Sequence, residues 1–128
     1  GLREHRHART AELSGGWKQR LALGCAVLHE PPILFLDEPT SGLAADDTTA
    51  LVELLAGLAK TTGKTIICTI HQPAKDEYEK FNLALVLGQG GIPMFYGPTK
   101  DGYRIFGSFL ERVGKPNNVD NPRDMFDM

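Results

Sequence analysis

The strongest constraint on the fold is an apolar run that ends in two acids. Residues 33–36 read Ile-Leu-Phe-Leu, and Asp37 and Glu38 follow directly. An apolar run without polar alternation is typical of a parallel strand that is covered on both faces. Carboxylates at the end of such a strand are costly to bury unless they serve a site, and ligands of open α/β sheets bind just beyond these ends. We therefore expect a layered fold in which Asp37 and Glu38 lie where a ligand could bind, although two acids alone would more simply form a solvated turn with a helix-capping acid.

Strand and helix patterns alternate along the chain, which favours an α/β fold with a mostly parallel core. The further expected strands are Thr65–Ile70, Leu83–Leu87 and Ile92–Tyr96, the last at an edge because it carries Pro93. The expected helix caps are Ser14 for the first helix and Asp46 or Asp47 for the second, which Gly63 should end; a short charged helix follows Pro73.

Apolar stripes predict which side of each helix is buried. The stripe of the first helix is predicted to contain Trp17, Leu21, Ala22, Cys25 and Leu28. The second helix is predicted to bury Leu51, Leu54, Leu55 and Leu58, and the last one Tyr103, Phe106, Phe109, Leu110 and Val113. Cys25 and Cys68 fit no zinc spacing, so we interpret both as reduced core residues.

Two other segments carry candidate chemistry. His71 follows the second buried strand, so it should lie at the same sheet edge as the two acids and could donate to a phosphate oxygen. Ser14, Gly15 and Gly16 stand at a helix N-terminus, where backbone N–H groups can approach a phosphate. Taken singly, each feature has a plain structural interpretation: a solvated turn, a structural histidine or an ordinary helix cap.

Together, these motifs resemble an ABC ATPase. Residues 13–16 resemble the ABC signature, residues 33–40 the Walker B strand with its catalytic glutamate, Ser41-Gly42-Leu43 the D-loop, and His71 the switch histidine of the H-loop. The resemblance implies a P-loop NTPase-type three-layer α/β fold with a mostly parallel sheet. It also implies ATP and Mg²⁺ as ligands, with ATP hydrolysis as the activity. The net charge of −2 gives no reason to expect nucleic acid as a partner.

The resemblance also assigns roles to individual residues. Asp37 would help to hold Mg²⁺ through water, Glu38 would activate the attacking water, and His71 would contact the γ-phosphate. The catalytic set is therefore Glu38 and His71, and the nucleotide-binding set is Ser14, Gly15, Gly16, Asp37 and Ser41. In the family the signature residues contact ATP on the opposite subunit. A second nucleotide-binding domain in a head-to-tail dimer is therefore the implied partner.

The sequence departs from the family pattern at three places. Trp17 stands where a glutamine or another polar residue is usual, and Ala44 stands where the D-loop usually has an aspartate, which Asp46 or Asp47 could replace. No P-loop is present: Gly63-Lys64-Thr65 opens a strand, whereas a P-loop opens a helix. We expect residues 1–128 to be the C-terminal part of a nucleotide-binding domain that begins upstream. Alone, this chain should neither bind MgATP tightly nor hydrolyse it.

Three segments resemble the G (White-type) transporters and bacterial relatives that fuse an FHA domain, a cassette and an ABC-2 membrane domain. They are His71-Gln72-Pro73, Phe95-Tyr96-Gly97-Pro98 and residues 120–127. This resemblance implies a transmembrane domain as partner, a location at the cytoplasmic face of a membrane, and a linker at residues 115–128. Two alternatives stay open: a soluble ABC ATPase of DNA repair or translation, and a degenerate regulatory cassette that only binds nucleotide.

Overall fold

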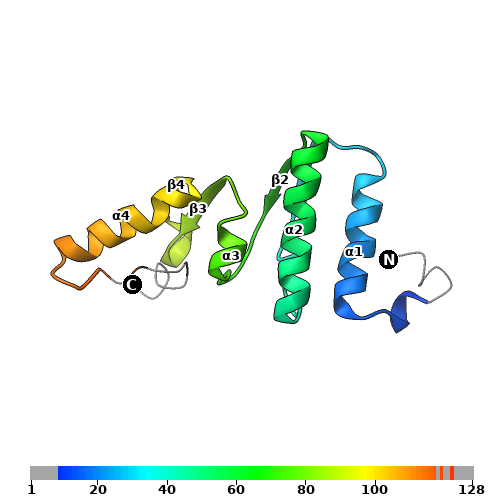
Figure 1. Ribbon diagram of the computed structural model, residues 1–128, viewed down its shortest axis with the longest axis horizontal. Helices are drawn as coiled ribbons and strands as arrows, with labels where there is room; N and C mark the ends of the chain where they lie inside the picture. The colour runs from blue at the N-terminus through cyan, green and yellow to red at the C-terminus, as the bar shows by residue number, and fades with distance from the viewer. Residues whose placement is uncertain (1–8, 118, 120–121, 123–128) are drawn as a thin grey trace. The chain divides into compact units, whose positions relative to one another are not determined.

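The computed structural model describes residues 9–117, 119 and 122, which belong to two compact units (Figure 1). Unit 1 extends to Ile70 and unit 2 begins at His71. Unit 1 contains η2 (Thr10–Glu12), α1 (Gly15–Val27), β1 (Ile33–Leu36), α2 (Ala45–Thr62) and β2 (Thr65–Cys68). Unit 2 contains α3 (Lys75–Tyr78), β3 (Leu83–Leu87), η3 (Gln89–Gly91), β4 (Pro93–Pro98) and α4 (Thr99–Arg112).

Unit 1 is built on a parallel pair of strands that α2 connects. β1 and β2 run in register from Ile33 opposite Thr65 to Leu36 opposite Cys68. β2 ends two residues earlier than predicted, but the Thr69 N–H still donates to the Leu36 carbonyl at 3.0 Å. The predicted parallel pairing is therefore confirmed, and residues 37 and 69 follow the two strand ends side by side.

One face of this strand pair is covered by helices, and the cluster includes Leu23, Leu34, Leu51 and Leu55. Figure 1 shows α1 and α2 side by side, with their N-termini at the same end. The other face is open, since Phe35 is 72% exposed whereas Leu34 is 6% exposed. The expectation that β1 is covered on both faces is thus wrong for the described residues, because α1 and α2 supply cover on one side only.

The apolar stripe predicted for α1 is wrong in part: Trp17 and Leu21 are half-buried, but the other three predicted residues are not. Leu23 is its buried apolar residue and Val27 packs partly beside it, whereas Ala22, Cys25 and Leu28 are exposed. Cys25 and Cys68 are free thiols; Cys25 is not a core residue, and Cys68 is half-buried. Apolar residues occur on every side of α1, so helical spacing could not select the face that meets α2 and β1.

The C-terminal end of α2 was predicted correctly, whereas its N-cap was not. Gly63 is the C-cap, as predicted, with φ of 67° and its N–H bonded to the Ala59 carbonyl at 3.0 Å. The N-cap is Ala44, not Asp46 or Asp47, which lie in the first turn where their charges suit the helix dipole. In the predicted stripe Leu51 and Leu55 are buried and Leu58 packs partly against the same core, whereas Leu54 is exposed; the buried Val52 was not predicted.

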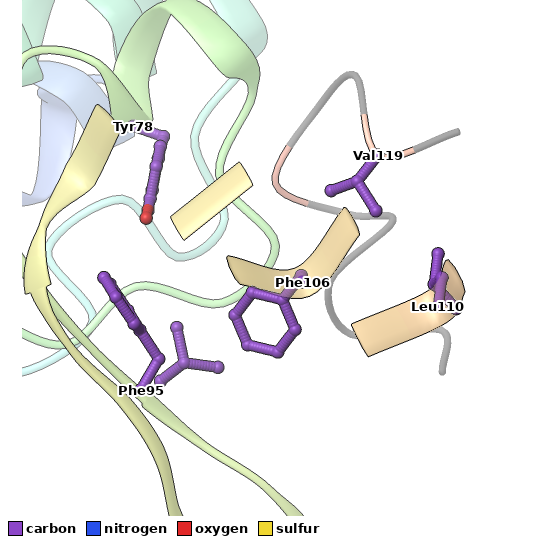
Figure 2. Close-up of a cluster of buried hydrophobic side chains, with 6 residues drawn as sticks. Tyr78, Phe95, Phe106, Leu110 and Val119 are labelled. Atoms are coloured by element: carbon purple, nitrogen blue, oxygen red, sulfur yellow. The ribbon is translucent and has the colours of Figure 1, made fainter. Parts of the chain in front are cut away.

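Unit 2 is an antiparallel hairpin covered by α4. β3 pairs with β4 from Leu83 opposite Pro98 to Leu87 opposite Pro93, with an irregularity after Val86. β3 has the predicted bounds, and β4 begins one residue later and ends two residues later than predicted. Figure 2 shows the core side chains that α3, β4, α4 and the following segment contribute; the full cluster is Tyr78, Val86, Phe95, Phe106, Leu110 and Val119.

The last predicted stripe is right for Phe106 and Leu110, whereas Phe109 and Val113 are half exposed. Val113 caps the helix and so lies beyond its regular turns. After α4, Asn117 donates to the Glu111 carboxylate at 3.0 Å, and Val119 and Pro122 are buried. The remaining residues of the predicted linker, 118, 120–121 and 123–128, lie outside the described part. Within that part, no helix combines the length and apolar character needed to cross a membrane.

Candidate functional site

The two acids after β1 are joined through a single side chain of the neighbouring strand end. Thr69 Oγ1 donates to Asp37 Oδ1 at 2.7 Å and accepts the Glu38 backbone N–H at 2.8 Å. The parallel register brings Thr69 there, because it follows Cys68 as Asp37 follows Leu36. The result is a fixed strand-end arrangement in which the Asp37 carboxylate and the Glu38 backbone share one hydroxyl group.

Glu38 lies in a backbone conformation that non-glycine residues seldom adopt. Its φ is 43°, in the left-handed region, which costs of the order of 1–3 kcal/mol and persists only where the surrounding contacts hold it. Two hydrogen bonds hold it here: the N–H bonds to Thr69, and the Ser41 N–H donates to the Glu38 carbonyl at 3.0 Å. The chain therefore turns sharply at Glu38, and both acids are exposed.

The donor set at this strand end fits a Mg²⁺–nucleotide site in part. Mg²⁺ prefers oxygen ligands and is usually held by one or two carboxylates together with waters and substrate phosphates. Asp37 offers an exposed carboxylate whose Oδ1 is already oriented by Thr69. Among residues 9–117, 119 and 122, no three His, Cys, Asp or Glu side chains gather to hold a metal by themselves. Asp37 is thus the residue of this site that suits the ion.

Ser14, Gly15 and Gly16 form the N-terminus of α1. The Ser14 hydroxyl accepts the Trp17 N–H at 3.5 Å, which confirms the predicted N-cap. Gly16 is buried, and a Cβ added there would lie 2.8 Å from the Asp47 carboxylate of α2. Within the described residues, no hydrogen bond joins Ser14 to Glu38. The predicted use of Ser14 and the two glycines by a partner's nucleotide stays a prediction.

The two unusual residues of the motifs have ordinary local surroundings. Trp17 is half-buried, and the Arg20 guanidinium lies 5.0 Å from the centroid of its ring. Ala44 is the N-cap of α2 and makes no side-chain capping bond. Of the two acids that could replace the usual D-loop aspartate, Asp47 lies against Gly16, whereas Asp46 is exposed.

His71 and Ser41 complete the predicted set. Ser41 is exposed and contributes its backbone N–H to the turn at Glu38. His71 opens unit 2 and is exposed, and the next residue, Gln72, has a positive φ of 48°. The parallel strands bring Asp37, Glu38 and Thr69 together within unit 1. The meeting of His71 with the acids, and its contact with a γ-phosphate, stay predictions.

The comparisons with known proteins agree with these motifs. The family model described as ABC transporter matches residues 1–41. ABC transporter G family member 6 of Dictyostelium discoideum is 36% identical over 115 residues, which cover 88% of this chain. Protein SNQ2 of Saccharomyces cerevisiae is 34% identical over 131 residues, covering 97% of this chain.

This chain belongs to the ABC transporter family. The matched residues 1–41 include the segments that resemble the signature and the Walker B strand. A solved ABC transporter in an inward-facing conformation matches 73% of the chain with a TM-score of 0.66 and 30% identity. The chain spans 7% of the Dictyostelium protein, 9% of SNQ2 and 36% of the solved transporter chain.

Sequence reasoning missed one residue of this candidate site, Thr69. The signal was present, because Thr69 is a hydroxyl residue within the expected strand Thr65–Ile70, two positions before His71. Its meaning depends on strand register, which places residue 69 beside residue 37 only when Leu36 lies opposite Cys68. Apolar patterning gives the strands but not their register.

Proposed function

We propose that this chain is part of the nucleotide-binding domain of a G-type ABC transporter and serves ATP hydrolysis that powers transport across a membrane. The observation that carries the proposal is the strand-end arrangement in which Thr69 bonds to both Asp37 and Glu38. It lies where ligands of α/β sheets bind. Support comes from the family match and from relatives named as G family and multidrug transporters.

In the proposed reaction, Glu38 is the general base. Its carboxylate accepts a proton from a water molecule, whose oxygen attacks the γ-phosphorus of ATP. The bond between that phosphorus and the β,γ-bridging oxygen breaks, and the bridging oxygen leaves with ADP. The turn at φ 43° holds Glu38 just beyond the strand end, so its backbone is fixed before the substrate arrives.

Asp37 and His71 have supporting roles in this proposal. Asp37 would hold Mg²⁺ through its water shell, and the bound ion supplies positive charge against the phosphates. His71 would donate a hydrogen bond to the γ-phosphate. Ser41 belongs to the turn that follows Glu38 and is proposed to contribute to nucleotide binding through the D-loop.

The proposed site is shared between two nucleotide-binding domains. Ser14, Gly15 and Gly16 begin a helix of 13 residues, whose N-terminal N–H groups and dipole favour a phosphate. We propose that they bind ATP held by the opposite domain of a head-to-tail dimer. Each active site then contains Glu38 from one domain and the signature residues from the other.

The same proposal places the domain at the cytoplasmic face of a membrane, beside a transmembrane domain. Residues 1–128 would be the C-terminal part of the nucleotide-binding domain, and residues 115–128 would lead towards the membrane domain. The buried Val119 and Pro122 indicate that such a connection would begin packed on unit 2. The Dictyostelium relative is named as an ABC transporter and a Candida glabrata relative as an ABC multidrug transporter, which favours this function over a soluble repair or translation ATPase.

We also propose that the 128 residues alone are not a working ATPase. Their sequence contains no Gly-x-x-x-x-Gly-Lys-Ser/Thr loop, which supplies most phosphate contacts in this class of enzyme. Calorimetric titration of the isolated chain with MgATP should give no heat of tight binding. A micromolar dissociation constant would contradict this part of the proposal.

The test of the proposed function compares two variants of the full-length transporter. Glu38→Gln removes the base but keeps its size, so hydrolysis should fall by at least about 10²-fold while ATP stays bound. Asp37→Asn should weaken Mg²⁺-dependent ATP binding as well as turnover, because it removes charge from the metal ligand. ATP affinity and steady-state hydrolysis are measured for both. Near-normal turnover in Glu38→Gln would show that Glu38 is not the base.

A further inference from the structure

Thr69, the residue directly after β2, makes hydrogen bonds to both acids that follow β1. A hydroxyl group has one donor hydrogen and two acceptor lone pairs, so Oγ1 can serve Asp37 and the Glu38 N–H at the same time. The bond to the Asp37 carboxylate is charge-assisted, and such bonds are stronger than those between neutral groups. The Thr69 N–H is in turn fixed by the Leu36 carbonyl at 3.0 Å, so the hydroxyl projects from a paired backbone.

We propose that Thr69 is a positioning residue for ATP hydrolysis, acting through Asp37 and Glu38 rather than on the substrate. The inference rests on the proposed function of these two acids. Thr69 has two effects at once: it fixes the orientation of the metal-binding carboxylate, and it holds the backbone turn that carries the general base.

The first effect concerns the carboxylate. Asp37 is exposed at the strand end, where an unrestrained side chain would sample several rotamers. The bond from Thr69 occupies Oδ1 and so selects one orientation, which leaves Oδ2 for a ligand. Partners that orient a metal-binding side chain in this way are typically worth about 10–100-fold in metal affinity or activity.

The second effect concerns the turn at Glu38. A residue with φ of 43° is strained, and the strained conformation persists only when its neighbours hold it. Thr69 accepts the Glu38 N–H on one side, while Ser41 donates to the Glu38 carbonyl on the other. Without the hydroxyl, the N–H loses this partner and the direction of the Glu38 side chain is less well defined.

The test uses Thr69→Val and Thr69→Ser in the full-length transporter. Valine keeps the shape of threonine but loses both hydrogen bonds, whereas serine keeps the hydroxyl group. Hydrolysis by Thr69→Val should fall about 10–100-fold, and that of Thr69→Ser should remain close to native. The second readout is Mn²⁺ binding in the presence of a non-hydrolysable ATP analogue, followed by electron paramagnetic resonance. Mn²⁺ should bind more weakly to Thr69→Val and normally to Thr69→Ser.

Thr62→Val is the matched control. The Thr62 hydroxyl donates to the Leu58 carbonyl at 2.7 Å within α2, so the change removes a threonine hydrogen bond elsewhere in unit 1. It should leave hydrolysis and Mn²⁺ binding unchanged. If Thr69→Val yields no assembled transporter, Thr69→Ala is compared with Thr69→Ser, because these two differ only in the hydroxyl group.

Two results would overturn the role of Thr69: native behaviour of Thr69→Val in both readouts, or equal losses in Thr69→Val and Thr69→Ser. Glu38→Gln, measured in parallel, separates this failure from failure of the proposed function. An inactive Glu38→Gln beside a native Thr69→Val refutes the Thr69 inference alone. Normal turnover in Glu38→Gln refutes the proposed base, and the Mn²⁺ readout then still decides whether Thr69 orients Asp37.

Discussion

The two units of this chain differ in the contacts that stabilise the interior of each. Unit 1 packs aliphatic side chains on one face of a parallel strand pair, and Thr69 makes two side-chain hydrogen bonds at the carboxyl ends of these strands. Unit 2 instead has an aromatic core, in which Phe95 meets Phe106 edge to face with ring centroids 6.2 Å apart. In unit 1 the polar contacts position candidate chemistry, whereas the contacts of unit 2 are chiefly packing.

The largest expected effect is the loss of stability when a core side chain of one unit is truncated, and it should be confined to that unit. Phe106 is 3% exposed, so Phe106→Ala removes a ring from the centre of unit 2 and should cost about 3–5 kcal/mol. Amide hydrogen exchange, measured by mass spectrometry on the full-length protein, should accelerate across β3, β4 and α4. Leu55→Ala is the matched change in unit 1, since Leu55 is 2% exposed, and should accelerate exchange in α1, α2 and β1 at a cost of about 2–5 kcal/mol.

Equal acceleration of exchange in both units by either substitution would contradict the prediction that each core stabilises its own unit. Such a result would mean that the two units unfold as one cooperative body. Phe109→Ala, at a half-exposed position of the same helix as Phe106, provides the control and should have a much smaller effect.

A smaller effect is expected where α1 meets α2. Gly16→Ala places a Cβ 2.8 Å from the Asp47 carboxylate, so that side chain must move and unit 1 should lose about 1 kcal/mol. In an Asp47→Ala background the obstacle is gone, and alanine should then be the better helix residue by about 0.5–1 kcal/mol. Hydrogen exchange of α1 is measured in the native protein, the two single variants and the double variant. It shows whether Gly16→Ala destabilises unit 1 when Asp47 is present and stabilises it when Asp47 is absent. Destabilisation by Gly16→Ala in both backgrounds would contradict the contact.

The smallest effect concerns Tyr78 in the aromatic core. Burial raises the pKa of its hydroxyl, which has no hydrogen-bond partner among the described residues. The folded chain therefore favours neutral tyrosine, and its stability should be unaffected below the unfolded pKa of about 10 and fall as the pH rises beyond it. Tyr78→Phe should change the melting temperature little at neutral pH and flatten this alkaline loss.

Thermal unfolding between neutral pH and strongly alkaline pH tests the Tyr78 prediction. Tyr96→Phe is the control, because Tyr96 is 72% exposed on the hairpin. An alkaline loss of equal size in the native chain and in Tyr78→Phe would show that Tyr78 is not its source.

Apolar runs and capping residues predicted where helices and strands begin and end better than they predicted which faces are buried. The apolar runs gave β1 and β3 with their observed bounds, and Ser14 and Gly63 marked helix ends correctly because capping depends on neighbouring residues. The buried side of α1 was predicted wrongly, since the partner surface decides it and the apolar residues of α1 do not. The prediction that both faces of β1 are covered was wrong for a related reason. An apolar pattern shows which residues are apolar but not which elements pack on them.

The candidate site shows the same division. Asp37 and Glu38 were predicted from their position after a buried strand, which needs only local pattern and the general behaviour of α/β sheets. Thr69 was not predicted, because its place beside Asp37 depends on the register between strands that are about 30 residues apart in the chain. The positive φ of Glu38 was also not visible in the sequence, since glutamate does not favour it.

We propose that the strand end held by Thr69 carries the base for ATP hydrolysis. Single-turnover hydrolysis of ATP by the full-length transporter isolates the chemical step from product release. We expect Glu38→Gln to bind ATP with native affinity and to cleave it at least about 10²-fold more slowly than the native protein. A chemical step at the native rate in Glu38→Gln, with ATP bound normally, would contradict the account.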